Sequence, residues 1–242
     1  MNRNEAQANY NRKVEVTLKQ DFWNYESKEE VFDAIEKYGV YTDPDEAYEV
    51  SFSAYENIIL QNESEKSNIV ESITLSSDGL CGIKKIIQFS SSVKEAKENY
   101  KLIREGMFEC LIWPAHVQSI NICRGFKYPF DDRIDLALVD IQSFYEKIDN
   151  EKKLSVSLIN SIKNDKRNCL FDRAYLNLMT FTWLCSFGNF NNFIVERNLE
   201  AFVNNTEGKL KAELWTETKK FDEEYFKKLI SKTHKYRTKN IN

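Results

Sequence analysis

The sequence predicts an α+β fold: a mostly helical single domain with a small, largely antiparallel sheet of about four strands. The 242 residues contain only 7 Gly and 3 Pro, so breaks are few and the helices should be long. Several segments repeat apolar residues at helical spacing, whereas a few short ones are rich in β-branched residues. No internal repeat or low-complexity linker divides the chain, which favours one mixed domain.

The amino terminus is polar and carries no apolar core. We therefore expect residues 1–12 to form a disordered tail, ahead of a single α+β domain over residues 13–242. Directly after the tail, Val14, Val16 and Leu18 alternate with polar residues. This period of two predicts a short strand.

Two helix starts follow in close succession. Ser27 and Glu30 form a capping box, and Gly39 is suited to end the helix that they open. Asp43 can cap a second helix, with Pro44 in its first turn. The apolar stripe of that second helix is Tyr48, Phe52, Tyr55 and Ile59.

The sheet is predicted in the middle of the chain. The four expected strands lie at residues 69–75, 83–89, 107–113 and 118–123. Between the second and third strands, Ser92 and Glu95 form another capping box and predict a helix. Pro114 marks the break between the third and fourth strands, because proline cannot donate to a sheet ladder.

The carboxy-terminal half is predicted to be helical. A stripe of period 3.6 predicts the clearest helix of the chain, at 131–148. The stripe consists of Ile134, Leu138, Ile141, Tyr145 and Ile148. Further helices are expected at residues 153–163, 171–187, 190–203 and 221–237, with a short extended piece at 210–215.

Composition excludes several classes of protein. The net charge of −4 gives no global attraction to nucleic acid or anionic membrane, and no apolar run is long enough to span a bilayer. Five widely spaced cysteines and two histidines offer no metal-site spacing, so we expect reduced thiols in a cytoplasmic protein and no bound metal. No glycine-rich fingerprint predicts a cofactor. The oligomeric state is not predicted by any of these features.

The densest group of polar side chains lies just before and inside the start of the predicted 131–148 helix. Its members are His116, Asn121, Arg124, Asp131, Asp132, Arg133 and Asp135. One interpretation is structural: Asp132 caps the helix, Asp135 occupies its third position, and Arg133 pairs with a neighbouring carboxylate. Asn121 would then cross-link neighbouring segments as a buried amide.

The other interpretation is functional. Guanidinium groups match phosphate and carboxylate groups, aspartate can bind a ribose hydroxyl or act as a base, and histidine titrates near neutrality. The candidate ligand-binding residues are Asn121, Arg124, Arg133 and Arg237, and the candidate catalytic residues are His116, Asp132 and Asp135.

The same segment carries a family resemblance. Its motifs are Ser119-Ile120-Asn121, Arg124-Gly125-Phe126, Asp132-Arg133-Ile134-Asp135-Leu136 and Phe144-Tyr145. They resemble the central pattern of an uncharacterised bacterial domain family, over most of the chain from about residue 43. A Glu and an Arg of that pattern are replaced here by Val139 and Gln142. The resemblance implies a shared fold and a shared pocket, but no particular reaction.

Two hypotheses about function remain, of which the sequence favours the first, and the sequence does not decide whether the protein is an enzyme. In the first, an Arg/Asp/Asn pocket at the start of the 131–148 helix binds or processes a phosphorylated small molecule, a nucleotide or nucleic acid. In the second, the protein is a non-catalytic protein-interaction module, for example in phage defence or counter-defence, and the polar group is structural. A sealed, mutually satisfied set of Arg124, Arg133 and Asp135 would favour the second hypothesis.

The carboxy terminus is a separate candidate for contact with phosphates. From Lys227 onward the chain has no acidic residue. Its basic residues are Lys227, Lys228, Lys232, His234, Lys235, Arg237 and Lys239. These side chains could contact RNA or DNA. The competing interpretation is a solvated helix end that complements its own dipole.

Overall fold

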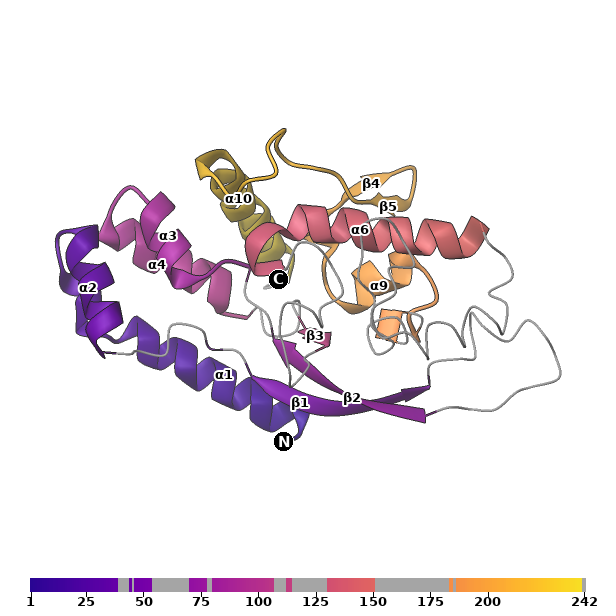
Figure 1. Ribbon diagram of the computed structural model, residues 1–242, viewed down its shortest axis with the longest axis horizontal. Helices are drawn as coiled ribbons and strands as arrows, with labels where there is room; N and C mark the ends of the chain where they lie inside the picture. The colour runs from indigo at the N-terminus through magenta and orange to yellow at the C-terminus, as the bar shows by residue number, and fades with distance from the viewer. Residues whose placement is uncertain are drawn as a thin grey trace.

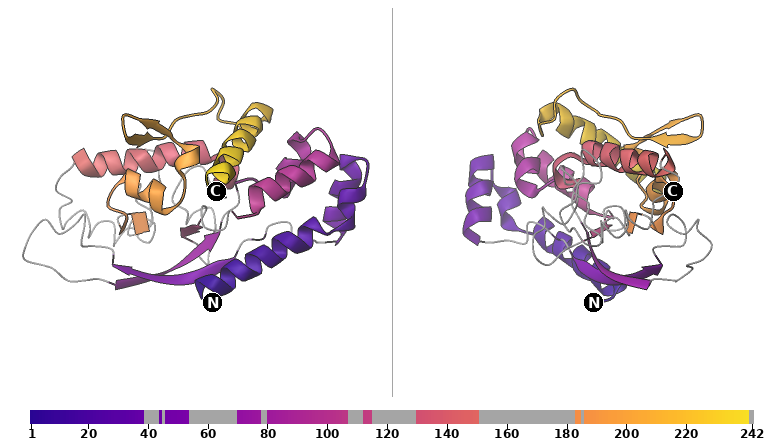
Figure 2. Two further views of the ribbon diagram at one scale, coloured as in Figure 1. Left: turned by 180° about the vertical axis from the view of Figure 1, so that it is seen from behind. Right: turned by 45° about the vertical axis from the view of Figure 1, so that its right-hand side comes forward.

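The chain is mostly helical with a small antiparallel sheet, as a computed structural model shows (Figure 1). The structure describes residues 1–38, 44, 46–53, 70–77, 80–106, 112–114, 130–150, 183–184 and 186–240. Helix α1 and strands β1 and β2 lie on one side of the molecule, and helices α6 and α10 lie on the opposite side in every view (Figures 1 and 2).

Helix α1 (Arg3–Leu18) occupies the segment for which we expected a disordered tail and then a strand. Asn2 and Glu5 close a capping box at its start, and the side chain of Asn2 accepts from the backbone N–H of Glu5 at 3.0 Å. The buried side chains recur at helical spacing: Ala6, Tyr10, Val14 and Thr17. The alternation of apolar and polar residues predicted the wrong element, because Val14 and Val16 do not share a buried face: Val16 is 39% exposed, whereas Val14 faces the core.

Helix α2 (Lys28–Tyr38) confirms the first predicted helix start. A short 3-10 helix, η1 (Asp21–Asn24), precedes it. The backbone N–H of Glu30 donates to Ser27 Oγ at 3.2 Å, and that of Ser27 donates to Glu30 Oε2 at 3.3 Å. The capping box therefore forms as the sequence predicts.

In the described part of the chain the main sheet has three strands in the order β1-β2-β3, not about four. They are β1 (Ala47–Ser53), β2 (Val70–Ser77) and β3 (Ile112–Pro114), and both pairings are antiparallel. Strand β1 replaces the helix expected after Asp43. Its seven residues pair with β2, with Val50 opposite Ile73, and this tertiary pairing outweighs the helical spacing of its aromatic residues.

Helix α3 (Ile83–Phe89) replaces the strand expected at residues 83–89. Ile83, Ile86 and Ile87 are buried at spacings of three and four, so the β-branched run packs as one face of a helix. Helix α4 (Val93–Arg104) confirms the prediction from Ser92 and Glu95. Strand β3 coincides with the end of the third expected strand; residues 107–111 of that strand and the whole fourth strand, at 118–123, lie outside the described residues.

Helix α6 (Phe130–Asn150) confirms the predicted helix at 131–148. The helix expected at 190–203 is shorter in the structure: α9 spans Phe190–Glu196, and a 3-10 helix, η2 (Glu200–Phe202), follows it. Strands β4 (Asn204–Thr206) and β5 (Lys209–Lys211) form a separate hairpin, followed by α10 (Glu223–Asn240). The helix expected at 153–163 and most of that at 171–187 lie outside the described residues.

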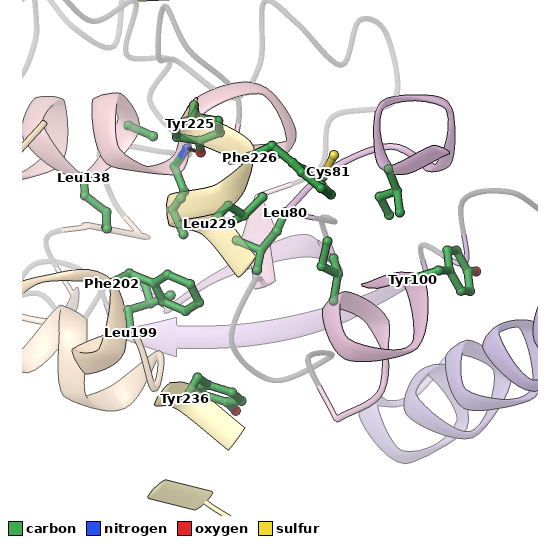
Figure 3. Close-up of a cluster of buried hydrophobic side chains, with 14 of the residues drawn as sticks. Leu80, Cys81, Tyr100, Leu138, Leu199, Phe202, Tyr225, Phe226, Leu229 and Tyr236 are labelled. Atoms are coloured by element: carbon green, nitrogen blue, oxygen red, sulfur yellow. Dashed lines mark hydrogen bonds between the residues drawn. The ribbon is translucent and has the colours of Figure 1, made fainter. Parts of the chain in front are cut away.

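Buried aromatic and leucine side chains pack α10 against the core of the molecule. Tyr225 and Leu229 of α10 gather with Leu138 of α6 and with Leu80 in one buried cluster (Figure 3). The ring of Trp215 stacks on Tyr225 with centroids 5.5 Å apart. None of the described helices combines the length and apolar character that a membrane span needs.

Candidate functional site

The start of α6 contains a break at Arg133. Its backbone angles, φ −152° and ψ 87°, are not helical, although the helix continues on both sides. The break frees the backbone N–H of Ile134, which donates to the hydroxyl oxygen of Tyr225 at 3.0 Å. Asp135 follows in the first turn after the break, and its Oδ1 accepts from the backbone N–H of Leu136 at 2.9 Å. The regular helical conformation therefore resumes at Ile134.

Arg133 and Asp135 form a two-pronged ion pair inside the protein. Nε of Arg133 donates to Oδ1 of Asp135 at 2.8 Å, and Nη2 donates to Oδ2 at 2.8 Å. The two residues are 1% and 0% exposed. This fork geometry is the strongest arrangement that a guanidinium and a carboxylate can make, and here both groups are removed from water.

The segment before α10 satisfies the remaining polar atoms of this pair. Nη1 of Arg133 donates to the carbonyl oxygens of Thr218 at 2.6 Å and Lys220 at 2.8 Å. Oδ2 of Asp135 accepts from the backbone N–H of Trp215 at 3.1 Å. The pair therefore bridges the start of α6 to a stretch of chain 80 to 87 residues later.

Tyr225 completes what we call the α6–α10 junction: Arg133, Ile134, Asp135, Trp215 and Tyr225. The guanidinium of Arg133 lies 4.4 Å from the centre of the Tyr225 ring, within range of a cation–π interaction. Burial, and then the charge of Asp135, raise the pKa of the Tyr225 hydroxyl well above its usual value. Tyr225 therefore stays neutral and available as a hydrogen-bonding group.

The electrostatics of Arg133 follow from the same contacts. Burial alone would lower the pKa of its guanidinium, but the hydrogen bonds and the charge of Asp135 raise it above the ordinary value. Arg133 is thus a permanent cation, held by a carboxylate and two carbonyl oxygens. Such a set of contacts neutralises charge and leaves no guanidinium edge facing solvent.

Of the other candidate residues, Arg237 has a described side chain, and it lies away from this junction. Arg237 lies twelve residues beyond Tyr225 on α10, about 18 Å along the helix. Its Nη2 donates to the carbonyl oxygen of Glu105 at 3.1 Å and to Oε2 of the same residue at 3.2 Å. Asp132 lies in the first turns of α6, but its side chain is not described, and His116, Asn121 and Arg124 lie outside the described residues.

Sequence reasoning overlooked the partners of Arg133 and Asp135. Trp215, Thr218 and Lys220 contribute only backbone groups, which no residue pattern marks. Tyr225 matches the family pattern near the carboxy terminus, but no local pattern indicates that it contacts Arg133 or Ile134. Arg104 was also overlooked: it is 1% exposed and donates to the carbonyl oxygen of Cys81 at 3.1 Å.

A surface hollow lies between α6, α9 and the β4–β5 hairpin. Its volume is about 670 Å³, and its walls include Gln142, Asn191 and Lys209. Neither Arg133 nor Asp135 lines it. In the part of the chain that the structure describes, no three His, Cys, Asp or Glu side chains come together as potential metal ligands.

Comparison with known proteins identifies one matching protein family. A model of a protein family of unknown function matches residues 14–167. The match starts before residue 43 and includes Arg133 and Asp135, whereas Trp215 and Tyr225 lie beyond its end. No curated protein and no solved structure matches the chain.

Proposed function

The protein belongs to DUF6994, a family of unknown function, and we propose that it is a non-catalytic interaction protein. In this proposal Arg133 and Asp135 join α6 to α10 and do not bind a ligand. The observation that carries the proposal is that both side chains are buried. Their charged groups are hydrogen-bonded to each other and to backbone groups.

The chemistry of the pair supports a structural role. A catalytic base or a phosphate-binding arginine must come within hydrogen-bonding distance of its substrate. Asp135 already accepts from Arg133 and from two backbone N–H groups, at 2.8 to 3.1 Å. A ligand would have to break several of these bonds and leave buried charges unpaired, which is costly.

The competing hypothesis places a nucleotide or another phosphorylated molecule at Asn121 and Arg124. A thermal-shift screen of the full chain with nucleoside mono-, di- and triphosphates and sugar phosphates separates the two. We expect no member of the panel to raise the melting temperature. A compound that stabilises the wild type but not Arg124→Ala would overturn the proposal and support the phosphate site, because only binding to the folded state stabilises it. Lys209→Ala serves as the control for loss of one exposed charge.

A further inference from the structure

Helix α10 carries three lysines on one face, at helical spacings of four and three residues. They are Lys228, Lys232 and Lys235, which we call the α10 lysine stripe. We propose that this stripe binds the phosphate backbone of duplex nucleic acid without reading its sequence. The inference does not rest on the Arg133–Asp135 ion pair, although the ammonium of Lys232 lies 5.7 Å from the ring of Trp215, a member of the α6–α10 junction.

The stripe is presented to solvent. Lys228 and Lys235 are exposed, and Lys232 is partly buried with its ammonium 5.7 Å from the centre of the Trp215 ring. The seven helical steps from Lys228 to Lys235 span about 10 Å along the helix. That length covers about three nucleotide steps, because phosphates along one strand are spaced about 3.4 Å along the duplex axis.

Few acidic groups neutralise the stripe. The chain has no Asp or Glu after Glu224. Among the described residues Lys228 and Lys235 make no ion pair, in contrast to Lys227, whose Nζ lies 2.6 Å from Glu223. The pKa of Lys232 is lowered first by burial; Glu213 opposes this, and the charges of Lys235 and Lys228 lower it further. The ammonium group of Lys232 is therefore close enough to those of Lys228 and Lys235 to be repelled by both.

The helix dipole does not account for this arrangement. Basic residues complement the dipole only within the last turn of a helix. Because α10 ends at Asn240, that turn contains Arg237 and Lys239, whereas Lys228 lies near the helix start and Lys232 near its middle. Like charges at a spacing of four destabilise an isolated helix. A bound polyanion would remove that repulsion.

The stripe fits a duplex better than a single strand. Proteins that hold single strands stack bases on exposed aromatic rings. The large apolar side chains that are exposed in the described part of the chain lie elsewhere, and none is on α10: they are Met1, Val16, Tyr25, Val195 and Leu214. Lysine ammonium groups can contact phosphates, but without aromatic rings beside them there is no surface on which unpaired bases can stack.

Fluorescence anisotropy with a labelled DNA duplex of about 20 base pairs, at about 50 mM to 200 mM salt, tests the proposal. For three phosphate contacts we expect a slope of log K against log salt of about −2.7. Lys228→Gln/Lys235→Gln should reduce the slope to about −0.9 and weaken binding at the lowest salt at least about tenfold. Lys209→Gln/Lys211→Gln removes two exposed charges on the β4–β5 hairpin and should change neither quantity.

Three results would overturn the proposal. The first is no binding of the duplex at about 100 µM protein in the lowest salt. The second is equal binding by the wild type and Lys228→Gln/Lys235→Gln, with both folded by circular dichroism. The third is displacement of the duplex by poly-L-glutamate at equal charge concentration, which would indicate an acidic protein partner. None of these results bears on the thermal-shift screen, so the two proposals can fail separately.

Discussion

The hydroxyl oxygen of Tyr225 accepts the backbone N–H of Ile134 at 3.0 Å, across 91 residues of sequence. The donor follows directly after the break in α6 at Arg133. A side chain from α10 thus takes the role that an Asp, Asn, Ser or Thr cap usually takes at a helix start. The break in α6 and the position of α10 therefore depend on each other.

Removing this hydroxyl should destabilise the protein. In Tyr225→Phe the buried N–H of Ile134 loses its acceptor, so the free energy of unfolding should fall by about 1–3 kcal/mol. Urea denaturation measures the change. Tyr25→Phe, at a tyrosine that is 41% exposed, is the control and should change stability by less than about 0.5 kcal/mol. Equal effects of the two substitutions would rule out the capping role of Tyr225.

Two amide side chains should protect the outer edge of strand β5. Oδ1 of Asn191 accepts from the backbone N–H of Leu210 at 3.2 Å, and Oε1 of Gln142 accepts from that of Ala212 at 2.7 Å. Hydrogen exchange should accelerate at Leu210 in Asn191→Ala and at Ala212 in Gln142→Ala. Each variant is the control for the other. Faster exchange over the whole hairpin in both variants would show that the hairpin detaches as a unit.

Asp222 should make the start of α10 sensitive to acid. The Thr218 hydroxyl, at 2.5 Å, and then the backbone N–H of Tyr225, at 2.9 Å, lower the pKa of this carboxyl below 3.8. Its contribution to stability is present above pH 3.8 and is lost as the pH falls through the lower folded-state pKa. The melting temperatures of wild type and Asp222→Asn should therefore converge as the pH is lowered below 3.8. A constant difference across that range would contradict the assignment.

Arg237 should contribute far less than Arg133 to the free energy of unfolding. Its side chain is 24% exposed and that of its partner Glu105 is 39% exposed, so solvent screens the ion pair. Arg237→Gln should cost less than about 1 kcal/mol in urea denaturation, and the loss should shrink at high salt. A loss as large as that of a buried charge would mean that Arg237 has a structural role comparable to that of Arg133.

Local patterns in the sequence predicted some elements and missed others, for identifiable reasons. The capping boxes at Ser27 and Ser92 and the stripe from Ile134 to Tyr145 are local signals, and the helices that they predict are present. The isoleucines of residues 83–89 fit a strand by β-propensity, but burial of one face makes them helical.

The candidate site was predictable only in part. The sequence singled out Arg133 and Asp135 and allowed that Arg133 pairs with a carboxylate. It could not indicate that Asp135 is that carboxylate, because residues two apart in a regular helix do not face each other. They meet here because Arg133 leaves the helical conformation. The partners at Trp215 and Tyr225 come from tertiary packing, which local patterns do not contain.

A double-mutant cycle on Arg133 and Asp135 tests the structural role of the pair most directly. Because each single change, Arg133→Met or Asp135→Leu, leaves a buried charge without its partner, each should cost about 3–5 kcal/mol in the free energy of unfolding. The double variant should cost at least about 1 kcal/mol less than the sum of the two. Costs that add to within about 0.5 kcal/mol would contradict the account, because two residues that satisfy each other cannot act independently.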